Sequence, residues 1–212
     1  IPNTVSGLNP LTILSEIDNV FVATEPSTLI LGSYDFVCVP APTKFHNIHN
    51  IFPALLDTAL EKSTSDKKIL VTHVPFEGSQ HSSEELIEPF DGEYVKKFQI
   101  PNIFSYIILG HMHKFQQIES ILPMFYSGSS ERFNFEEEND DKYTLLVELK
   151  LEQEIKVKPI RLPIRKMITL IDFDCSGSSG SKIEKFVLDS IDIRAKELKD
   201  ALVGIKLQNI DI

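Results

Sequence analysis

Two short apolar runs stand out in the hydrophobic pattern of the chain. Ile69 to Val71 and Tyr106 to Leu109 contain no charged residue, and each is bounded by polar or turn-forming residues. Runs of this length predict strands that are buried on both faces. Apolar residues at helical spacing within positions 52–62 predict an amphipathic helix before the first run. A helix followed by a buried strand is the unit of a layered α/β fold.

The remaining pattern predicts further short elements. Asn9 and Pro10 are typical of the N-cap and first residue of a short helix that reaches Ile17. Ser82, three residues before Glu85, resembles a capping box and predicts a helix after the first buried strand. Strands are predicted at 20–23, 29–31, 36–39, 118–126 and 143–162.

The C-terminal quarter of the chain has its own pattern. Residues 162–166, which include Pro163, predict a linker. The segment after it predicts a strand, a Gly/Ser loop, a helix and a last strand, at 167–173, 176–181, 183–198 and 202–210. We therefore expect a main domain over 1–162 and a small β-α-β domain over 163–212.

Composition narrows the class of protein. Hydrophobic residues make up 42% and charged residues 25% of the 212 positions, which is typical of a globular protein. No apolar run approaches the roughly 20 residues needed to cross a bilayer. Cys38 and Cys175 are isolated, which favours a reducing compartment over a disulfide framework. We expect a cytoplasmic protein with no membrane partner.

Charge neither supports nor excludes a nucleic-acid partner. The net charge is -10, whereas phosphate binding usually shows as a basic patch. Much of the excess lies in one acidic run, which we interpret as a solvated loop: Glu136, Glu137, Glu138, Asp140 and Asp141. Bound divalent metals would supply positive potential where a phosphate sits.

Histidines follow both buried strands. His73 comes directly after the first, and His111 and His113 come after the second, behind Gly110. Ligand sites in open α/β sheets lie beyond the carboxyl ends of the strands, so these three imidazoles should meet. In extended backbone the two imidazoles of an H-x-H pair lie on one side, and Gly110 permits a close approach. The pattern predicts a metal site without naming the metal.

The other histidines carry weaker signals. His46 and His49 are three residues apart and could share a helix face, where a solvated pair is the simpler interpretation. His81, in the loop after His73, could contact a substrate or simply lie exposed.

Three segments carry a family resemblance: Thr72-His73 with Pro75, 109–114 (L-G-H-M-H-K) and 126–133 (Y-S-G-S-S-E-R-F). In order and spacing they resemble the SbcD-type nucleases of the calcineurin-like metallophosphoesterase superfamily. The last run is the most specific, because generic phosphatases lack it. The resemblance spans nearly the whole chain, with 1–17 similar to the loop and helix after the family's G-N-H-D motif and 167–212 similar to its capping domain.

The resemblance implies a fold and a mechanism. The fold would be the C-terminal part of a four-layer β-sandwich flanked by helices, with a capping domain. Two Mn²⁺ ions, about 3.5–4 Å apart in such sites, would polarise a DNA phosphodiester and supply a hydroxide nucleophile. His73 and His111 would bind one ion and His113 the other. Substrate binding would fall to the loop that carries Tyr126, Ser127, Gly128, Ser129 and Arg132.

The resemblance also implies partner proteins and shows that three motifs of the family are missing from this sequence. Members of the family work with an SbcC-type ATPase and form homodimers through helices, one of which resembles 9–17. The family's D-x-H, G-D and G-N-H-D motifs would lie before Ile1. We therefore expect this polypeptide alone to be inactive.

Two other functions stay open. A generic calcineurin-like phosphatase or phosphodiesterase would act on small phosphoesters, although the run at 126–132 argues against it. A non-catalytic scaffold could have kept the fold, although three retained histidines argue against that.

Overall fold

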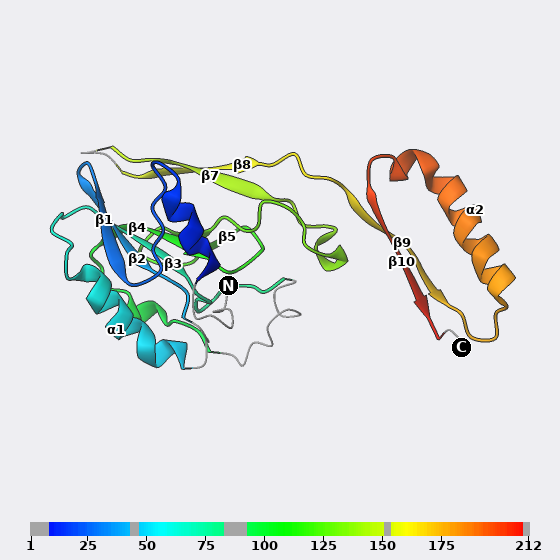
Figure 1. Ribbon diagram of the computed structural model, residues 1–212. Helices are drawn as coiled ribbons and strands as arrows, with labels where there is room; N and C mark the ends of the chain where they lie inside the picture. Colours follow the sequence, from blue (N-terminus) through cyan, green and yellow to red (C-terminus); the bar gives the residue numbers. More distant parts are fainter. Residues whose placement is uncertain (1–8, 43–46, 83–92, 151–153, 210–212) are drawn as a thin grey trace. The chain divides into compact units, whose positions relative to one another are not determined.

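The protein forms two compact units. The computed structural model describes residues 9–42, 47–82, 93–150 and 154–209 (Figure 1). Unit 1 comprises 1–129 and 143–160, and unit 2 comprises 130–142 and 161–212. We expected one boundary at 162–163, but 130–142 groups with the C-terminal part. The chain is a mixed α/β protein, with one six-stranded sheet and two smaller sheets.

The six-stranded sheet of unit 1 is mixed. Its strands lie in the order β1-β2-β3-β4-β6-β5. β2, β3, β4 and β6 are parallel, while β1 and β5 pair antiparallel at the two edges. The strands are β1 Ser27–Leu31, β2 Tyr34–Val39, β3 Lys68–His73, β4 Phe104–Gly110, β5 Gln116–Ile118 and β6 Met124–Tyr126. The carboxyl ends of four strands therefore lie at one edge of the sheet.

Both faces of this sheet are covered, as the apolar runs predicted. The helix α1 (Ile48–Leu60) packs on one face through a cluster that includes Phe52, Leu70 and Ile107. On the other face, Ile69 and Tyr106 pack against residues of the two-stranded sheet formed by β7 (Tyr143–Glu148) and β8 (Lys156–Arg161) and of the segments beside it. Figure 1 shows α1 and the β7–β8 pair on opposite sides of the sheet.

Most predicted elements of unit 1 are confirmed. Asn9 caps the 3-10 helix η1 (Pro10–Glu16), where its Oδ1 accepts from the Leu11 amide at 3.0 Å. A further 3-10 helix, η3, spans Lys97–Gln99. The strand expected at 20–23 is absent from the described backbone, and Phe21 is exposed.

The strands expected within 118–126 form an antiparallel pair. They are β5 and β6, and their register joins Ile118 to Met124. The strands expected within 143–162 are β7 and β8. The helix expected after Ser82 falls on residues outside the described ranges.

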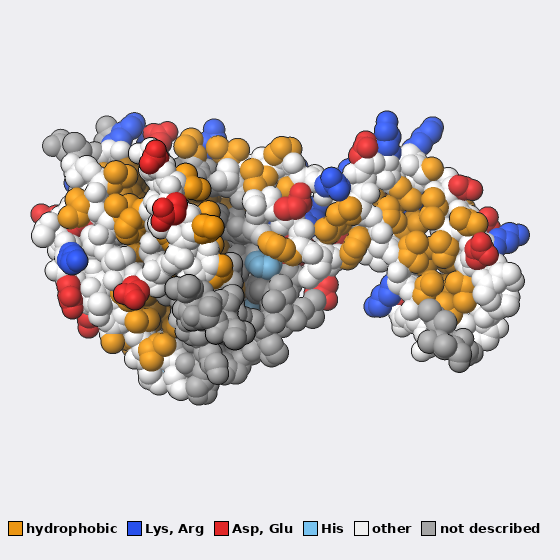
Figure 2. All heavy atoms as spheres, viewed as in Figure 1, with side chains coloured by type: hydrophobic (Ala, Val, Ile, Leu, Met, Phe, Trp, Pro, Cys, Tyr) orange, Lys and Arg blue, Asp and Glu red, His pale blue; other side chains and the backbone are white. Residues whose placement is uncertain are grey.

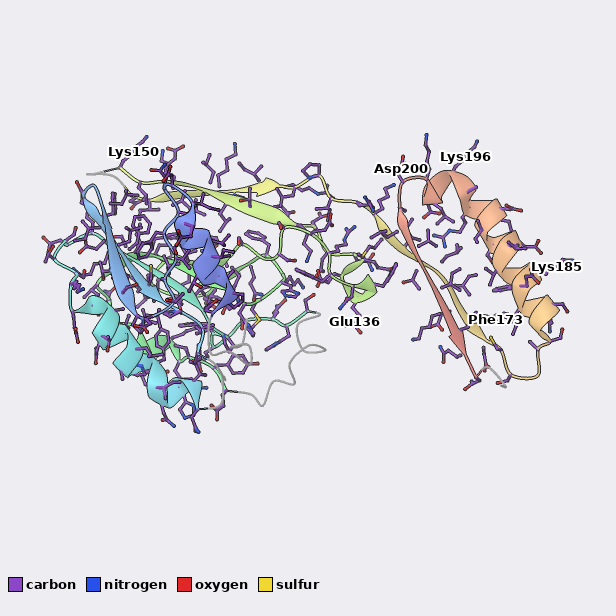
Figure 3. The ribbon with its side chains drawn as sticks, in the orientation of Figure 1. Glu136, Lys150, Phe173, Lys185, Lys196 and Asp200 are labelled. Atoms are coloured by element: carbon purple, nitrogen blue, oxygen red, sulfur yellow. The ribbon has the colours of Figure 1, made fainter. Side chains whose placement is uncertain are left out.

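Unit 2 contains the predicted β-α-β arrangement. β9 (Met167–Asp174) and β10 (Leu202–Gln208) are parallel neighbours, connected through α2 (Gly180–Leu198). Phe173 of β9 stacks on Phe186 of α2, with 4.4 Å between ring centroids (Figure 3). No described residue of α2 is buried. None of the described helices is long and apolar enough to cross a membrane.

The acidic run is only in part the solvated loop that we expected. It forms the 3-10 helix η4 (Phe135–Glu137) and the turn after it. Glu137 pairs with Lys142, and both side chains are fully buried. Glu138 accepts the Thr169 amide of β9 at 2.7 Å. Glu137 alone among these acidic residues is buried, and the cation beside it compensates the burial of its carboxylate. Glu136 and Asp141 are exposed.

Candidate metal centre

The ends of β3 and β4 bring two of the predicted histidines together. The strands are parallel, and their register pairs His73 with Gly110. His111 follows at once, so its ring meets that of His73 edge to face, with 5.6 Å between centroids. The predicted meeting of these two imidazoles is confirmed.

Gly110 makes this close approach possible. A Cβ atom at position 110 would lie 2.6 Å from Nδ1 of His73, a distance that real Cβ atoms do not tolerate. The next residue is strained, since His111 has φ of 107°. Backbone in this region costs a non-glycine residue on the order of 1–3 kcal/mol and is concentrated at functional sites. The structure thus accommodates strain in order to present His111.

The H-x-H segment is not the extended backbone that we expected, because β4 ends at Gly110 and His111 has φ of 107°. Met112 is 2% exposed and belongs to the core cluster, while His111 and His113 are half-buried. Desolvation by the surrounding protein, with smaller contributions from His73, His81 and His113, lowers the pKa of His111 to about 4. Desolvation also lowers the pKa of His73, with a contribution from His113. The cluster therefore favours neutral imidazoles, the form that binds metals.

The loop after β6 fastens this cluster. The Tyr126 hydroxyl donates to the Val74 carbonyl at 2.8 Å, and the Ser129 amide donates to the His113 carbonyl at 3.0 Å. Gly128 has φ of 79°, and a Cβ there would lie 2.7 Å from the same His113 oxygen. β6 and the loop after it thus fix the positions of Val74, the residue after His73, and of the His113 backbone.

These contacts change the role predicted for two loop residues. Tyr126 is fully buried, so its side chain cannot contact a substrate and instead anchors the loop. Arg132 lies in unit 2, where Nε and Nη2 donate to the Asp140 carbonyl and Nη1 to the Arg165 carbonyl. Its guanidinium therefore connects two backbone segments. Substrate contact by Ser127, Gly128 and Ser129 stays a prediction.

His81 joins the cluster from the loop after β3. Its Nε2 shares a hydrogen bond of 2.7 Å with the Tyr94 hydroxyl. The neighbouring Gln80 is fixed by Gln116 of β5, which accepts from its amide at 2.7 Å and donates to its carbonyl at 2.9 Å. Tyr94 and Gln116 were not predicted, because neither lies at a spacing that links it to a histidine.

The other histidines and cysteines are not part of the cluster. His49 lies on α1, with Nδ1 3.7 Å from Glu93 Oε2, and His46 falls outside the described residues. Both cysteines are buried and reduced, as expected of small apolar residues.

The donor chemistry fits part of a metal centre. Imidazole nitrogens suit Mn²⁺ when oxygen ligands complete the set. Among the residues that the structure describes, no three His, Cys, Asp or Glu side chains are grouped so as to hold one ion. The three histidines are therefore not a complete site for a single ion. A two-metal arrangement, in which two of them bind one ion and the third binds the other, does not require such a grouping. No model of a known protein family matches this chain.

Proposed function

We propose that this chain supplies the histidine ligands of a two-metal phosphodiesterase that acts on DNA, as in SbcD-type nucleases. The observation that carries the proposal is the meeting of His73 and His111 at neighbouring parallel strand ends, 5.6 Å between ring centroids, around a strained His111 backbone. Parallel strand ends are where α/β proteins place ligands. We also propose that unit 1 has the metallophosphoesterase sandwich fold. A sheet that is covered on both faces is compatible with that fold.

Each residue of the cluster has a distinct part in the proposal. His73 and His111 would bind one Mn²⁺ and His113 the other, through neutral nitrogens. Bound metals would neutralise phosphate charge and activate water near neutral pH. Gly110 keeps the space that the His73 ring occupies, and Ser129 fixes the His113 backbone. His81, held by Tyr94, is placed to contact a substrate beside His111.

The proposal includes the lack of turnover by this polypeptide alone. The 212-residue sequence contains no D-x-H motif. Within the described ranges, no three His, Cys, Asp or Glu side chains are grouped so as to hold a metal ion. Bridging carboxylates would have to come from residues outside these.

Metal binding tests the proposal directly. Titration calorimetry with Mn²⁺ should show binding that His111→Ala weakens by tenfold or more. His49→Ala is the matched control, because it removes an imidazole from α1 outside the cluster. Equal affinity in all three proteins would refute the proposal. A second measurement separates a nuclease from a generic phosphatase. It compares the rate of hydrolysis of DNA ends with that of p-nitrophenyl phosphate, in a polypeptide that also contains the missing ligands.

The proposed partners are an SbcC-type ATPase and a second copy of the chain. η1 leaves Leu11, Ile13, Leu14 and Ile17 between 40% and 71% exposed, which is compatible with a helix that packs against another chain. Light scattering of the chain and of a Leu11→Glu, Leu14→Glu variant tests the homodimer. A monomeric wild-type chain would exclude it.

A further inference from the structure

The loop after β3 carries His81 and is fixed at its base. The Glu77 amide donates to the Val95 carbonyl at 2.9 Å, and the Val95 amide donates to the Pro75 carbonyl at 3.0 Å. These are the hydrogen bonds of a parallel bridge, which joins Phe76 to Val95. The loop therefore leaves the proposed metal centre along a fixed path.

Gln116 of β5 holds the far end of this loop at two points. Its Oε1 accepts from the Gln80 amide at 2.7 Å, and its Nε2 donates to the Gln80 carbonyl at 2.9 Å. A side-chain amide that satisfies both backbone groups of one residue replaces a neighbouring strand. We name these two hydrogen bonds the Gln116 clamp. Because Gln80 directly precedes His81, the clamp fixes the point at which His81 leaves the backbone.

Tyr94 fixes the ring of His81. The Tyr94 hydroxyl and His81 Nε2 share a hydrogen bond of 2.7 Å, and the two rings meet edge to face with 5.8 Å between centroids. His81 also contributes to the lowered pKa of His111, as a nearby imidazole does. The clamp and Tyr94 thus constrain both the backbone and the ring of one histidine beside the metal centre, which is how proteins hold a residue that contacts a ligand.

Lysines lie on two sides of the loop. Lys97 Nζ is 3.6 Å from the position that a Cβ atom would occupy at Gly78, and Lys114 Nζ donates to the side-chain carbonyl of the clamped residue at 3.3 Å. The carboxylate of the loop, Glu77, has its own cation, since its Oε1 lies 3.8 Å from Lys96 Nζ. Cations on both sides favour an anionic ligand at the loop.

We propose that Gln116 and Tyr94 are positioning residues, which hold His81 so that its imidazole N–H donates a hydrogen bond to a phosphate group of the nucleic-acid substrate. His81 is the contacting residue, and the other two act through it. The proposal rests on the proposed function, because the phosphate would be the one that the metals bind. It adds a phosphate contact outside the metal ligands, built wholly from residues of unit 1.

The test measures binding of thymidine 5′-monophosphate to the full chain by titration calorimetry, with Mn²⁺ and in metal-free buffer. His81→Ala should weaken binding about tenfold in both buffers, because the lost hydrogen bond has a charged acceptor. Gln116→Met should weaken it about fivefold and Tyr94→Phe about threefold, because the imidazole is kept but is no longer pre-organised. The matched control is Gln117→Met, which changes the same residue type at the next, exposed position of β5.

A double-variant cycle separates positioning from a structural role. In the His81→Ala background, Gln116→Met and Tyr94→Phe should cause no further loss of affinity, because both act only through His81. Equal losses with and without His81 would overturn the positioning role. So would an undetectable wild-type complex, equal affinity of the wild type and His81→Ala, or equal affinity for thymidine without its phosphate. Circular dichroism of all variants should match that of the wild type.

The outcomes separate this inference from the proposed function. His81 is not a metal ligand in the proposal, so His81→Ala should keep the Mn²⁺ affinity of the wild type. If His111→Ala loses Mn²⁺ while His81→Ala binds the nucleotide like the wild type, this inference falls and the metal centre stands. If the wild type binds no Mn²⁺ but His81→Ala still loses tenfold in metal-free buffer, the proposed function falls and the phosphate contact stands.

Discussion

The interiors of the two units are built differently. Unit 1 buries apolar side chains on both faces of its sheet, with Phe52, Leu70 and Tyr106 almost completely inaccessible. Unit 2 has a two-stranded sheet and a helix without a buried residue in its described range, and its most deeply buried side chains include Glu137 and Lys142. Figure 2 shows hydrophobic side chains exposed to solvent on unit 2. Leu188 of α2 is 54% exposed.

This difference has an energetic meaning. Apolar burial stabilises in proportion to area and tolerates small changes. A buried ion pair depends on both partners, because the loss of one leaves a charge in a medium that cannot solvate it. Unit 1 should therefore respond gradually to substitution, whereas unit 2 should respond sharply at one pair.

The largest expected effect comes from Lys142→Met. It leaves the Glu137 carboxylate buried without its cation, at a cost of about 3–5 kcal/mol. Hydrogen exchange should show faster exchange in unit 2 and little change in unit 1. Glu137→Leu with Lys142→Met is the control, because replacement of both charges should restore most of the stability. Equal protection of unit 2 in the single variant and the wild type would contradict this interpretation.

Leu70→Ala tests the apolar interior of unit 1. The side chain is fully buried between β3 and the α1 face, and its truncation should cost about 2–5 kcal/mol. Urea denaturation should show a lower midpoint with an unchanged slope. Leu188→Ala, on the exposed part of α2, should change stability by less than about 0.5 kcal/mol. Similar losses for the two would mean that burial does not separate them.

Asp35→Asn tests a polar site within unit 1. Asp35 is buried, and its Oδ2 accepts from Ser63 Oγ, the Thr64 amide and the Ser65 amide at 2.7 to 2.9 Å. Burial alone would raise the pKa of this carboxyl, but these donors and Lys68 outweigh it and hold the pKa below 3.8. The variant should lose about 1–3 kcal/mol.

The pH dependence of this effect has a fixed sign. A lowered carboxyl pKa stabilises the fold above the unfolded value, and the contribution is lost as pH falls through the folded value. The difference between wild type and Asp35→Asn should therefore be present at pH 7 and shrink below about pH 4. Asp57→Asn, on the exposed side of α1, is the control.

The last prediction concerns the protonation of His111. Its folded pKa of about 4 lies below the ordinary 6.5, so the unfolded chain takes up the proton first as pH falls. Stability of unit 1 should decrease between pH 6.5 and about 4 and should not fall further below that on this account. His111→Asn, which tolerates the positive φ, should flatten this part of the curve in denaturation measurements. A curve of unchanged slope in the variant would assign the decrease to other groups.

The sequence predicts those parts of the molecule whose pattern is local. Burial on both faces leaves an uninterrupted apolar run, so β3 and β4 could be predicted, as could the histidines at their ends. The Asn9-Pro10 start of η1 is equally local.

Other features depend on contacts between distant residues. Glu137 is one of several acidic residues in a row, and only the placement of Lys142 and η4 buries it. Tyr126 resembles a loop residue in sequence, but its hydroxyl reaches Val74, 52 residues earlier. The membership of 130–142 in unit 2 follows from contacts such as the one from Glu138 to Thr169.

The passage of the chain between units, at 129–130, 142–143 and 160–161, has a consequence for biosynthesis. On the ribosome, 130–142 emerges before the β9 and β10 segments that it joins. η4, which carries Glu137, contacts β9, so this contact forms only after translation has passed Asp174, the end of β9. Unit 2 then completes after the sheet of unit 1, since domains form as their residues become available. A protein cut at 162 would leave both pieces with an unfinished unit 2.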